Sequence, residues 1–207
     1  MLDVASRRGL VAAAGPDTLI VDTTDNVRQA FIDGPQSEDD PKTRIYASPK
    51  TSLNIPRVSH VAFTADENAL IVAAEQGGGL AVYDVSALAN GSKESAFQIA
   101  TNGTSLRVLQ PNPTPEFAHL VAVVLSDGKL LLANLQDKSL ANGINGPVIF
   151  EGVSSFSWSR KGKAFVAGLA NGTCIQMRTD QGAPKPMSTM PIPPTIAADS
   201  GYHGKLS

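Results

Sequence analysis

Apolar residues along this chain gather in short runs, and turn-forming residues separate the runs. No helical spacing persists over a window of about twelve residues, so the pattern favours short β-strands. From residue 58 onward it predicts three groups of four strands. They lie at 58–64, 69–75, 79–85 and 96–101, then at 105–110, 119–126, 129–135 and 146–151, and finally at 153–159, 163–169, 173–179 and 185–190.

The same pattern recurs along the chain. Residues 58–73 align without a gap to residues 153–168, a shift of 153 − 58 = 95, and a third copy lies between them at a shift of about 48 to 50. The period is therefore roughly 48 residues. The turn between second and third strands carries glycine each time, because a tight hairpin needs a positive φ there. These turns contain Gly77-Gly78-Gly79, Asp127-Gly128 and Asn171-Gly172.

The N-terminal stretch fits the same template, except that its first strand is missing. Residues 9–15, 18–23 and 27–32 match second, third and fourth strands. Four-stranded units that repeat every 40 to 50 residues or so are typical of β-propeller blades. The sequence thus predicts an all-β fold with about three and three-quarter blades of four antiparallel strands.

The expected domain division follows from these repeats. A partial propeller spans 1–191, with blades at about 1–32, 55–101, 105–151 and 153–190, and a long inter-blade loop lies at 33–54. Residues 192–207 are expected to form an irregular tail without strand alternation. Five prolines lie between residues 184 and 194, and proline has no backbone N–H to donate to a neighbouring strand of a sheet.

Composition and charge exclude several functions. With 17 basic and 19 acidic residues, the formal net charge of −2 provides no broad positive field, so direct nucleic-acid binding is not expected. The longest apolar run, Leu120 to Leu125, is far shorter than the roughly 20 residues of a membrane span, so no membrane insertion is expected. The single Cys174 cannot form an internal disulfide, and the N-terminus does not resemble a signal peptide. We therefore expect an intracellular protein.

No pattern points to catalysis. There is no glycine-flanked serine of the hydrolase type, and the three histidines, His60, His119 and His203, have no metal-ligand spacing. Gly77-Gly78-Gly79 precedes no predicted helix, which favours a hairpin turn over a phosphate loop. We therefore expect no catalytic residue, no cofactor and no metal site, and predict that the chain is not an enzyme.

One acidic cluster is a candidate for protein binding. Glu38, Asp39 and Asp40 lie together in the long loop, where they could meet a basic surface of a partner and steer association. The simpler alternative is a solvated inter-blade loop.

Four segments of the sequence carry a further likeness: residues 9–15, 55–64 and 72–85, and Ser155-Phe156-Ser157-Trp158-Ser159 followed by Gly162-Lys163. They resemble the N-terminal propeller of fungal cytoplasmic-filament nucleoporins. The similarity extends from about residue 2 to 196. The resemblance implies a seven-bladed, non-enzymatic docking scaffold at the cytoplasmic face of the nuclear pore complex. The implied partners are the DEAD-box RNA helicase of messenger-RNA export and other nuclear pore proteins.

The sequence departs from the family pattern in two respects. At about 48 residues per blade it covers roughly half of a seven-bladed ring, and none of its seven phenylalanines precedes a glycine, so it contains no phenylalanine-glycine repeat. We expect the chain to be part of a larger ring, and to be poorly soluble or oligomeric alone because its terminal blades expose faces.

A second interpretation is a generic WD-repeat-like interaction propeller unrelated to the pore. Tyr83-Asp84 stands near the end of a third strand, where that family has its Trp-Asp pair. The matching positions Asn134-Leu135 and Met177-Arg178 do not keep the pair.

Overall fold

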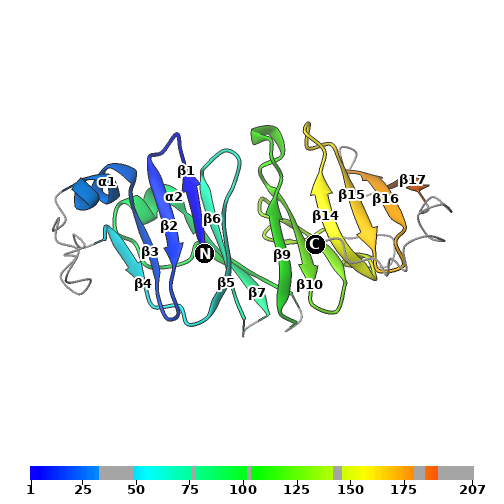
Figure 1. The fold of residues 1–207 in the computed structure, drawn as a ribbon, viewed down its shortest axis with the longest axis horizontal. Coiled ribbons are helices and arrows are strands. Elements are labelled where there is room, and N and C mark those ends of the chain that lie inside the picture. Colours follow the sequence, from blue (N-terminus) through cyan, green and yellow to red (C-terminus); the bar gives the residue numbers. More distant parts are fainter. Residues whose placement is uncertain (33–48, 76–77, 102–103, 142–145, 180–184, 191–207) are drawn as a thin grey trace.

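Four antiparallel sheets follow one another along the chain (Figure 1). The computed structural model describes residues 1–32, 49–75, 78–101, 104–141, 146–179 and the strand at 185–190. Within each sheet consecutive strands pair with one another, except that the last strand of the third sheet, at Val148–Phe150, pairs with the third strand at Leu130–Asn134. Every sheet is therefore built from one continuous segment of sequence.

The strands and helices have the following bounds. The first sheet contains β1 (Leu2–Ala5), β2 (Leu10–Ala14), β3 (Leu19–Thr23) and β4 (Thr51–Leu53), with helix α1 (Thr24–Ile32) between β3 and β4. The second contains β5 (Val58–Phe63), β6 (Ala69–Ala74), β7 (Gly79–Asp84) and β8 (Phe97–Ala100), with helix α2 (Val85–Ala89) between β7 and β8. The third contains β9 (Leu106–Pro111), β10 (Leu120–Leu125), β11 (Leu130–Asn134), β12 (Ser139–Leu140) and β13 (Val148–Phe150), with a short 3₁₀ helix at Pro115–Phe117. The fourth contains β14 (Val153–Trp158), β15 (Ala164–Leu169), β16 (Cys174–Arg178) and β17 (Lys185–Met190).

Neighbouring sheets bury apolar side chains against one another. Successive side chains of a strand point to opposite faces, so an inner sheet needs apolar residues at consecutive positions. On β11, Leu131 packs between the second and third sheets, and Leu132 packs between the third and fourth. All six residues of β10 are buried. This two-sided burial explains why the apolar runs are continuous and charge is sparse.

The hairpin glycines have the backbone conformation that the sequence predicts. Gly128, between β10 and β11, has φ +85°, and Gly172, between β15 and β16, has φ +82°. A side chain is strained in this left-handed region, which is why glycine recurs at these turns.

The strands predicted from residue 58 onward are confirmed, with ends that differ by one or two residues in most cases. The third sheet adds one detail. Its outermost position is shared by two short strands, because β12 pairs with one end of β11 and β13 with the other.

The prediction for the first sheet was wrong at three points. Its first strand is present, because Leu2–Ala5 pairs with β2. Residues 27–32, predicted as a strand, belong to α1. The backbone N–H of Asn26 donates to Thr23 Oγ1 at 3.1 Å, which is the interaction of an N-cap. The fourth strand is instead Thr51–Leu53, inside the segment 33–54 that was expected to be loop throughout.

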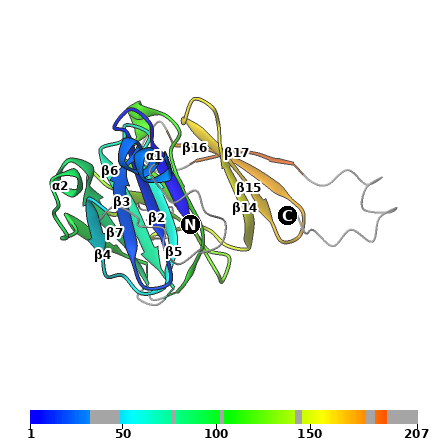
Figure 2. The same ribbon diagram turned by 60° about the vertical axis from the view of Figure 1, so that its left-hand side comes forward.

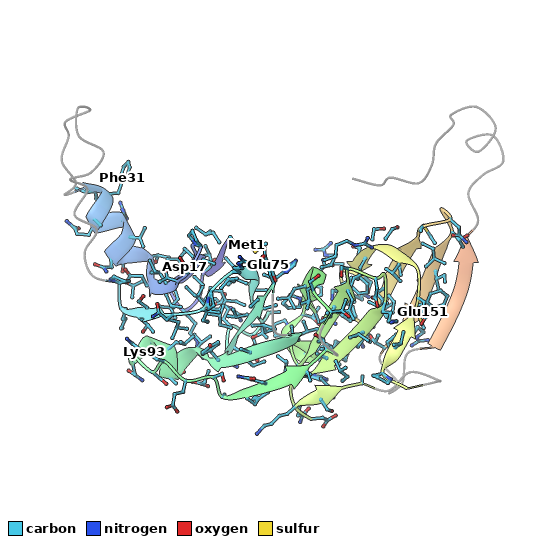
Figure 3. All side chains as sticks on the ribbon, turned by 90° about the horizontal axis from the view of Figure 1, so that it is seen from below. Met1, Asp17, Phe31, Glu75, Lys93 and Glu151 are labelled. Atoms are coloured by element: carbon cyan, nitrogen blue, oxygen red, sulfur yellow. The ribbon has the colours of Figure 1, made fainter. Side chains whose placement is uncertain are left out.

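The four sheets form an arc and not a closed ring. The first strands of neighbouring sheets contact one another, β1 with β5, β5 with β9 and β9 with β14. Figures 2 and 3 show the sheets fanning out from these strands, with the first and fourth sheets at the two ends of the arc. The predicted all-β propeller class, with four-stranded blades of an incomplete ring, is thus confirmed.

Candidate protein-interaction surface

The acidic candidates Glu38, Asp39 and Asp40 lie outside the described residues. The structure does describe what flanks them. The chain enters the segment from the end of α1 at Ile32 and returns to the first sheet at β4. The candidate loop therefore runs from the end of α1 to the outer strand of the first sheet.

Helix α1 presents apolar side chains to solvent. Phe31 is 85% exposed and Ile32 is 55% exposed, and no residue of the helix is buried. Val27, Ala30 and Phe31 share one side of the helix, since residues three and four apart are neighbours. Figure 3 shows Phe31 directed away from the sheets. Among the described residues, the large hydrophobic side chains classed as exposed all belong to the first blade, at Met1, Leu2, Val4, Phe31 and Ile32.

The first sheet has one face that no other described sheet covers. Its strand registers place Leu2, Ala13 and Ile20 in one row across this face, and Val4 and Val11 in the next. We call these five residues the open face. Leu2 is 67% exposed and Val4 is 43% exposed, whereas Leu10 and Leu19 on the opposite face are buried against the second sheet.

A polar contact joins α1 to the open-face side of this sheet. Asn26 Nδ2 donates to both carboxylate oxygens of Asp22, at 3.0 and 2.8 Å, and Asp22 is only 1% exposed. Asp22 lies beside Val11 in the strand register, on the same face. The first turn of α1 therefore packs over this side of the sheet.

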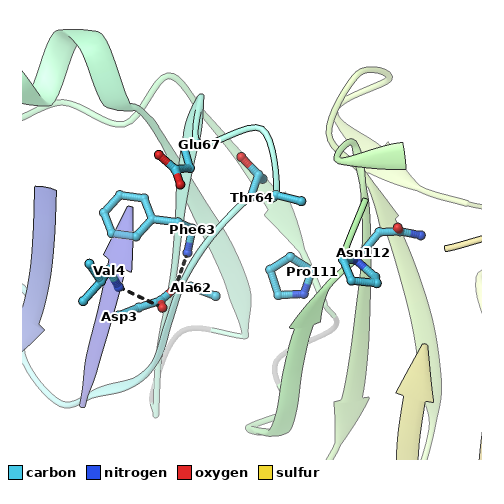
Figure 4. A pocket seen from close by; sticks show the side chains of 10 residues that line it. Asp3, Val4, Ala62, Phe63, Thr64, Glu67, Pro111 and Asn112 are labelled. Atoms are coloured by element: carbon cyan, nitrogen blue, oxygen red, sulfur yellow. Dashed lines mark hydrogen bonds between the residues drawn. The ribbon is translucent and has the colours of Figure 1, made fainter. Parts of the chain in front are cut away.

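A hollow of about 320 Å³ lies where the first three sheets meet (Figure 4). Its lining includes the carboxylates of Asp3 and Glu67, the Phe63 ring and Pro111. Asp3 Oδ2 accepts a hydrogen bond of 2.6 Å from the Phe63 backbone N–H, and Oδ1 accepts one of 2.9 Å from Val4. The carboxylate of Asp3 is thus used to tie the first sheet to the second.

Glu67 makes a second tie between the same sheets. Burial alone would raise the pKa of Glu67, but hydrogen bonds from Arg7 and Arg8 and the charge of Arg7 outweigh it and hold this pKa below its usual range. Glu67 Oε1 lies 3.5 Å from Arg7 Nε, and Oε2 accepts a 2.9 Å bond from the Arg8 backbone N–H. Both carboxylates of the hollow therefore hold the scaffold together and provide no acid–base pair for chemistry.

Further side chains bridge the later sheets. Trp158 Nε1 donates to the Gln110 carbonyl at 3.0 Å, and Asn112 Nδ2 donates to the Gly162 carbonyl at 2.8 Å. His60 Nε2 lies 3.2 Å from the Arg107 carbonyl, and Arg107 in turn donates to the Val153 carbonyl. Each seam between sheets thus combines apolar packing with a few directional bonds.

No group of three or more metal-ligating side chains occurs in the part of the chain that the structure describes. Within the same residues, no helix is long and apolar enough to cross a membrane. Of the three histidines, His60 and His119 lie on different sheets, and His203 lies outside the described ranges.

Asp84, half of the Tyr83-Asp84 pair in the WD-repeat interpretation, has a local role. Its Oδ1 accepts a hydrogen bond of 2.7 Å from the Ala87 N–H, which caps α2. In this chain the pair ends β7, and Asp84 is the N-cap of α2.

Sequence reasoning missed α1 and the exposed side chains that it carries. The signal was present, because a threonine precedes Asp25 and Asn26, and apolar residues follow at Val27, Ala30 and Phe31. A capping residue followed by apolar positions three and four residues apart indicates a helix start. The segment is short, and its apolar residues also satisfied the strand template of the other repeats.

A family model described as the NUP159/214 beta propeller matches residues 1–204. The nucleoporin NUP159 of Chaetomium thermophilum is 47% identical over 204 residues, which are 98% of this chain and 13% of that protein. The chain thus spans a small part of this relative.

Two solved structures show the same fold. The N-terminal domain of Nup159 aligns with a TM-score of 0.66 and 16% identity, covering 94% of this chain and 45% of that one. A complex of S. cerevisiae Dbp5 bound to Nup159, Gle1, IP6 and ADP aligns with a TM-score of 0.67 and 16% identity, covering 95% of this chain and 45% of the matching one. At these identities the likeness concerns the fold alone.

Proposed function

Because the chain belongs to the NUP159/214 β-propeller family, we propose that it supplies about half of a propeller that docks the DEAD-box RNA helicase of messenger-RNA export. In this proposal the propeller acts at the cytoplasmic face of the nuclear pore complex, beside other pore proteins. The family is one of scaffold propellers and not of enzymes.

The observation that carries the proposal is the 47% identity to a nucleoporin over nearly the whole chain. A structural neighbour of the same type is bound to Dbp5. The hollow at the sheet junction also fits a scaffold. The carboxylates of Asp3 and Glu67 in its lining bind backbone N–H groups of the neighbouring sheet, so they hold the sheets together. Family membership also decides against a WD-repeat-like platform unrelated to the pore.

We further propose that Glu38, Asp39 and Asp40 contribute to the docking surface. Three neighbouring carboxylates attract a basic surface, and the segment that carries them connects α1 to the outer strand of the first sheet. Attraction of this kind weakens as salt screens the charges.

The test uses a ring chimera, in which this chain replaces the matching segment of the C. thermophilum Nup159 propeller. Pull-downs with the export helicase of C. thermophilum compare the ring chimera with the unaltered C. thermophilum propeller. We expect both to retain the helicase. A chimera that is folded by circular dichroism but does not retain the helicase contradicts the docking proposal.

The loop is tested within the same experiment. Reversing the charges in the triple variant E38K/D39K/D40K should weaken helicase binding about tenfold or more at low salt. The matched control E75K/E94K/E151K reverses three exposed glutamates elsewhere and should bind as the unmodified chimera does. An equal loss of helicase binding in both triple variants would show a general effect of net charge, and it would contradict a role of Glu38, Asp39 and Asp40 in docking.

A further inference from the structure

One turn at the seam between the third and fourth sheets is strongly basic. The turn from β14 to β15 carries three exposed cationic side chains, Arg160, Lys161 and Lys163, and its Gly162 is buried. We call residues 160–163 the basic turn. None of the three cations forms an ion pair with another residue in the described part of the chain. Their charge is therefore not neutralised by an ion pair within these residues.

The turn that faces it, between β9 and β10, contains the dipeptide Thr114-Pro115. A Cβ built at Gly162 would lie 2.6 Å from Thr114 Oγ1, so the threonine hydroxyl lies against the basic turn. Lys163 reaches across the seam, because its Nζ lies 5.8 Å from the centre of the Phe117 ring. The Phe117 N–H donates to the Thr114 carbonyl at 3.1 Å, a bond that brings side chains three residues apart to one side of the turn. The Lys163 ammonium thus lies on the side that Thr114 occupies.

The Thr114 side chain can be released without loss of the seam. Pro113 and Pro115 on either side of it are exposed, and its own backbone is extended, with φ −112° and ψ 139°. Its hydroxyl donates a single neutral bond of 3.0 Å to Asn112 Oδ1. When the hydroxyl turns away, Asn112 keeps the 3.1 Å bond from the Thr114 backbone N–H and its own 2.8 Å bond across the seam. The buried amide of Asn112 therefore stays paired.

We propose that Thr114 is a phosphorylation site for a proline-directed protein kinase, and that the basic turn binds the phosphate. Such kinases select a proline directly after the acceptor residue, and Pro115 stands at that position. The kinase transfers the γ-phosphoryl group of ATP to Thr114 Oγ1. The bond from the γ-phosphorus to the bridging oxygen of ADP breaks, and the hydroxyl proton passes to the catalytic aspartate of the kinase. The site is independent of helicase docking.

The phosphate changes the charge where the two sheets meet. The three cations of the basic turn and the exposed Glu116 of the facing turn add up to +3 − 1 = +2, and a phosphate of nearly −2 brings this sum to about zero. The close approach of Gly162 leaves no room for the phosphate between the turns, so it lies on their outer side. Lys161 and Lys163 flank Gly162 there. Their charge-assisted bonds to the phosphate are stronger than the neutral bond that Thr114 gives up.

The first test measures whether the folded chain is modified. Ser48-Pro49 is the other serine–proline or threonine–proline dipeptide of the sequence, so a Ser48→Ala background isolates Thr114. With a purified cyclin-dependent kinase and ATP, mass spectrometry should find about one phosphate per chain, and Thr114→Ala should abolish it. The kcat/KM should stay within about tenfold of that for a peptide of residues 106–120, because only one neutral hydrogen bond has to break first.

Two results of this assay would overturn the site. One is a chain, folded by circular dichroism, that is modified more than about tenfold more slowly than the peptide, since Thr114 would then be inaccessible in the fold. The other is a peptide that the kinase does not modify. Should the free chain aggregate, the ring chimera gives the same comparison, with the phosphate assigned to Thr114 by peptide mapping.

The second test measures what binds the phosphate. In a ³¹P NMR titration the second pKa of the phosphate, ordinarily about 6, should be lowered by the neighbouring cations, so Lys161→Gln/Lys163→Gln should raise the midpoint by about 0.5 pH unit or more. The matched control Lys50→Gln/Lys93→Gln removes two exposed lysines beside the first and second sheets and should leave the midpoint unchanged. Equal midpoints in the two double variants would show that the basic turn does not bind the phosphate.

Discussion

At the scale of single residues, the seams between sheets depend on close backbone approaches. Asn112 is fully buried, donates to the Gly162 carbonyl and accepts bonds from Thr114, so its side-chain amide is satisfied across the seam. Gly162 has φ +67°, and a Cβ built there would lie 2.2 Å from Asn112 Oδ1. Only glycine fits this turn without displacing the buried amide.

Gly162→Ala should therefore destabilise the chain by about 2–4 kcal/mol, combining backbone strain with steric overlap. Gly91→Ala is the matched control, since Gly91 also has a positive φ, +86°, but no atom lies within 4 Å of its Cβ position. That variant should lose only about 1–2 kcal/mol. Urea denaturation followed by circular dichroism measures both values. Similar losses in the two variants would contradict a steric role for Asn112.

His60 predicts a pH dependence of stability. Burial lowers the pKa of His60 from its ordinary value of 6.5, and this effect exceeds the opposing one of the bond to the Arg107 carbonyl. Below pH 6.5 or so the unfolded chain therefore binds a proton that the folded chain does not, so stability falls as the pH drops towards the folded pKa and is constant above the unfolded one.

The variant His60→Gln should show a smaller fall in the free energy of unfolding between about pH 7.5 and 5.5 than the parent chain. The ordinary pKa values of Asp and Glu, about 3.9 and 4.3, lie below this interval. Denaturant titrations at four pH values provide the measurement. An unchanged slope in the variant would show that another group controls the pH response.

At the scale of elements, most of the fold follows from sequence, and the exceptions have identifiable physical causes. Strands buried on both faces, such as β10 and β11, leave continuous apolar runs bounded by hairpin glycines. Such runs are easy to recognise because they recur in each repeat of the sequence.

Elements that pack less were harder to predict. Helix α1 buries no residue, so packing leaves little pattern in its sequence, and β4 is only three residues long. The strand Leu2–Ala5 was missed because Leu2 and Val4 alternate with Asp3 and give no continuous run. The sequence predicted that a terminal blade exposes a face, but not which residues form it, since the error in the first strand hid Leu2 and Val4.

At the scale of the whole molecule, each sheet contacts its neighbours in chain order, so stability is expected to be divided among the seams. Leu131 and Leu132 are adjacent on β11 and equally buried, yet they face different seams. Substituting Leu131 or Leu132 therefore weakens the contact between one pair of sheets at a time.

Leu132→Ala should lower the free energy of unfolding by about 2–5 kcal/mol and speed hydrogen exchange mainly in the fourth sheet. Leu131→Ala should cost a similar amount but act mainly on the second sheet. Hydrogen exchange with mass spectrometry distinguishes the two. Uniform acceleration in both variants would mean that the four sheets unfold as one unit.

The completeness of each sheet has a consequence for synthesis. Within the described residues, each sheet is formed by strands that follow one another in sequence. The strand pairing with the largest sequence separation, Leu19 with Leu53, joins residues 53 − 19 = 34 positions apart. The ribosome releases the chain from its N-terminus at about 5–20 residues per second, so each sheet can form before the next has left the exit tunnel. The blades of a nascent chain can thus fold one after another, and each new sheet can pack against a sheet that has already folded.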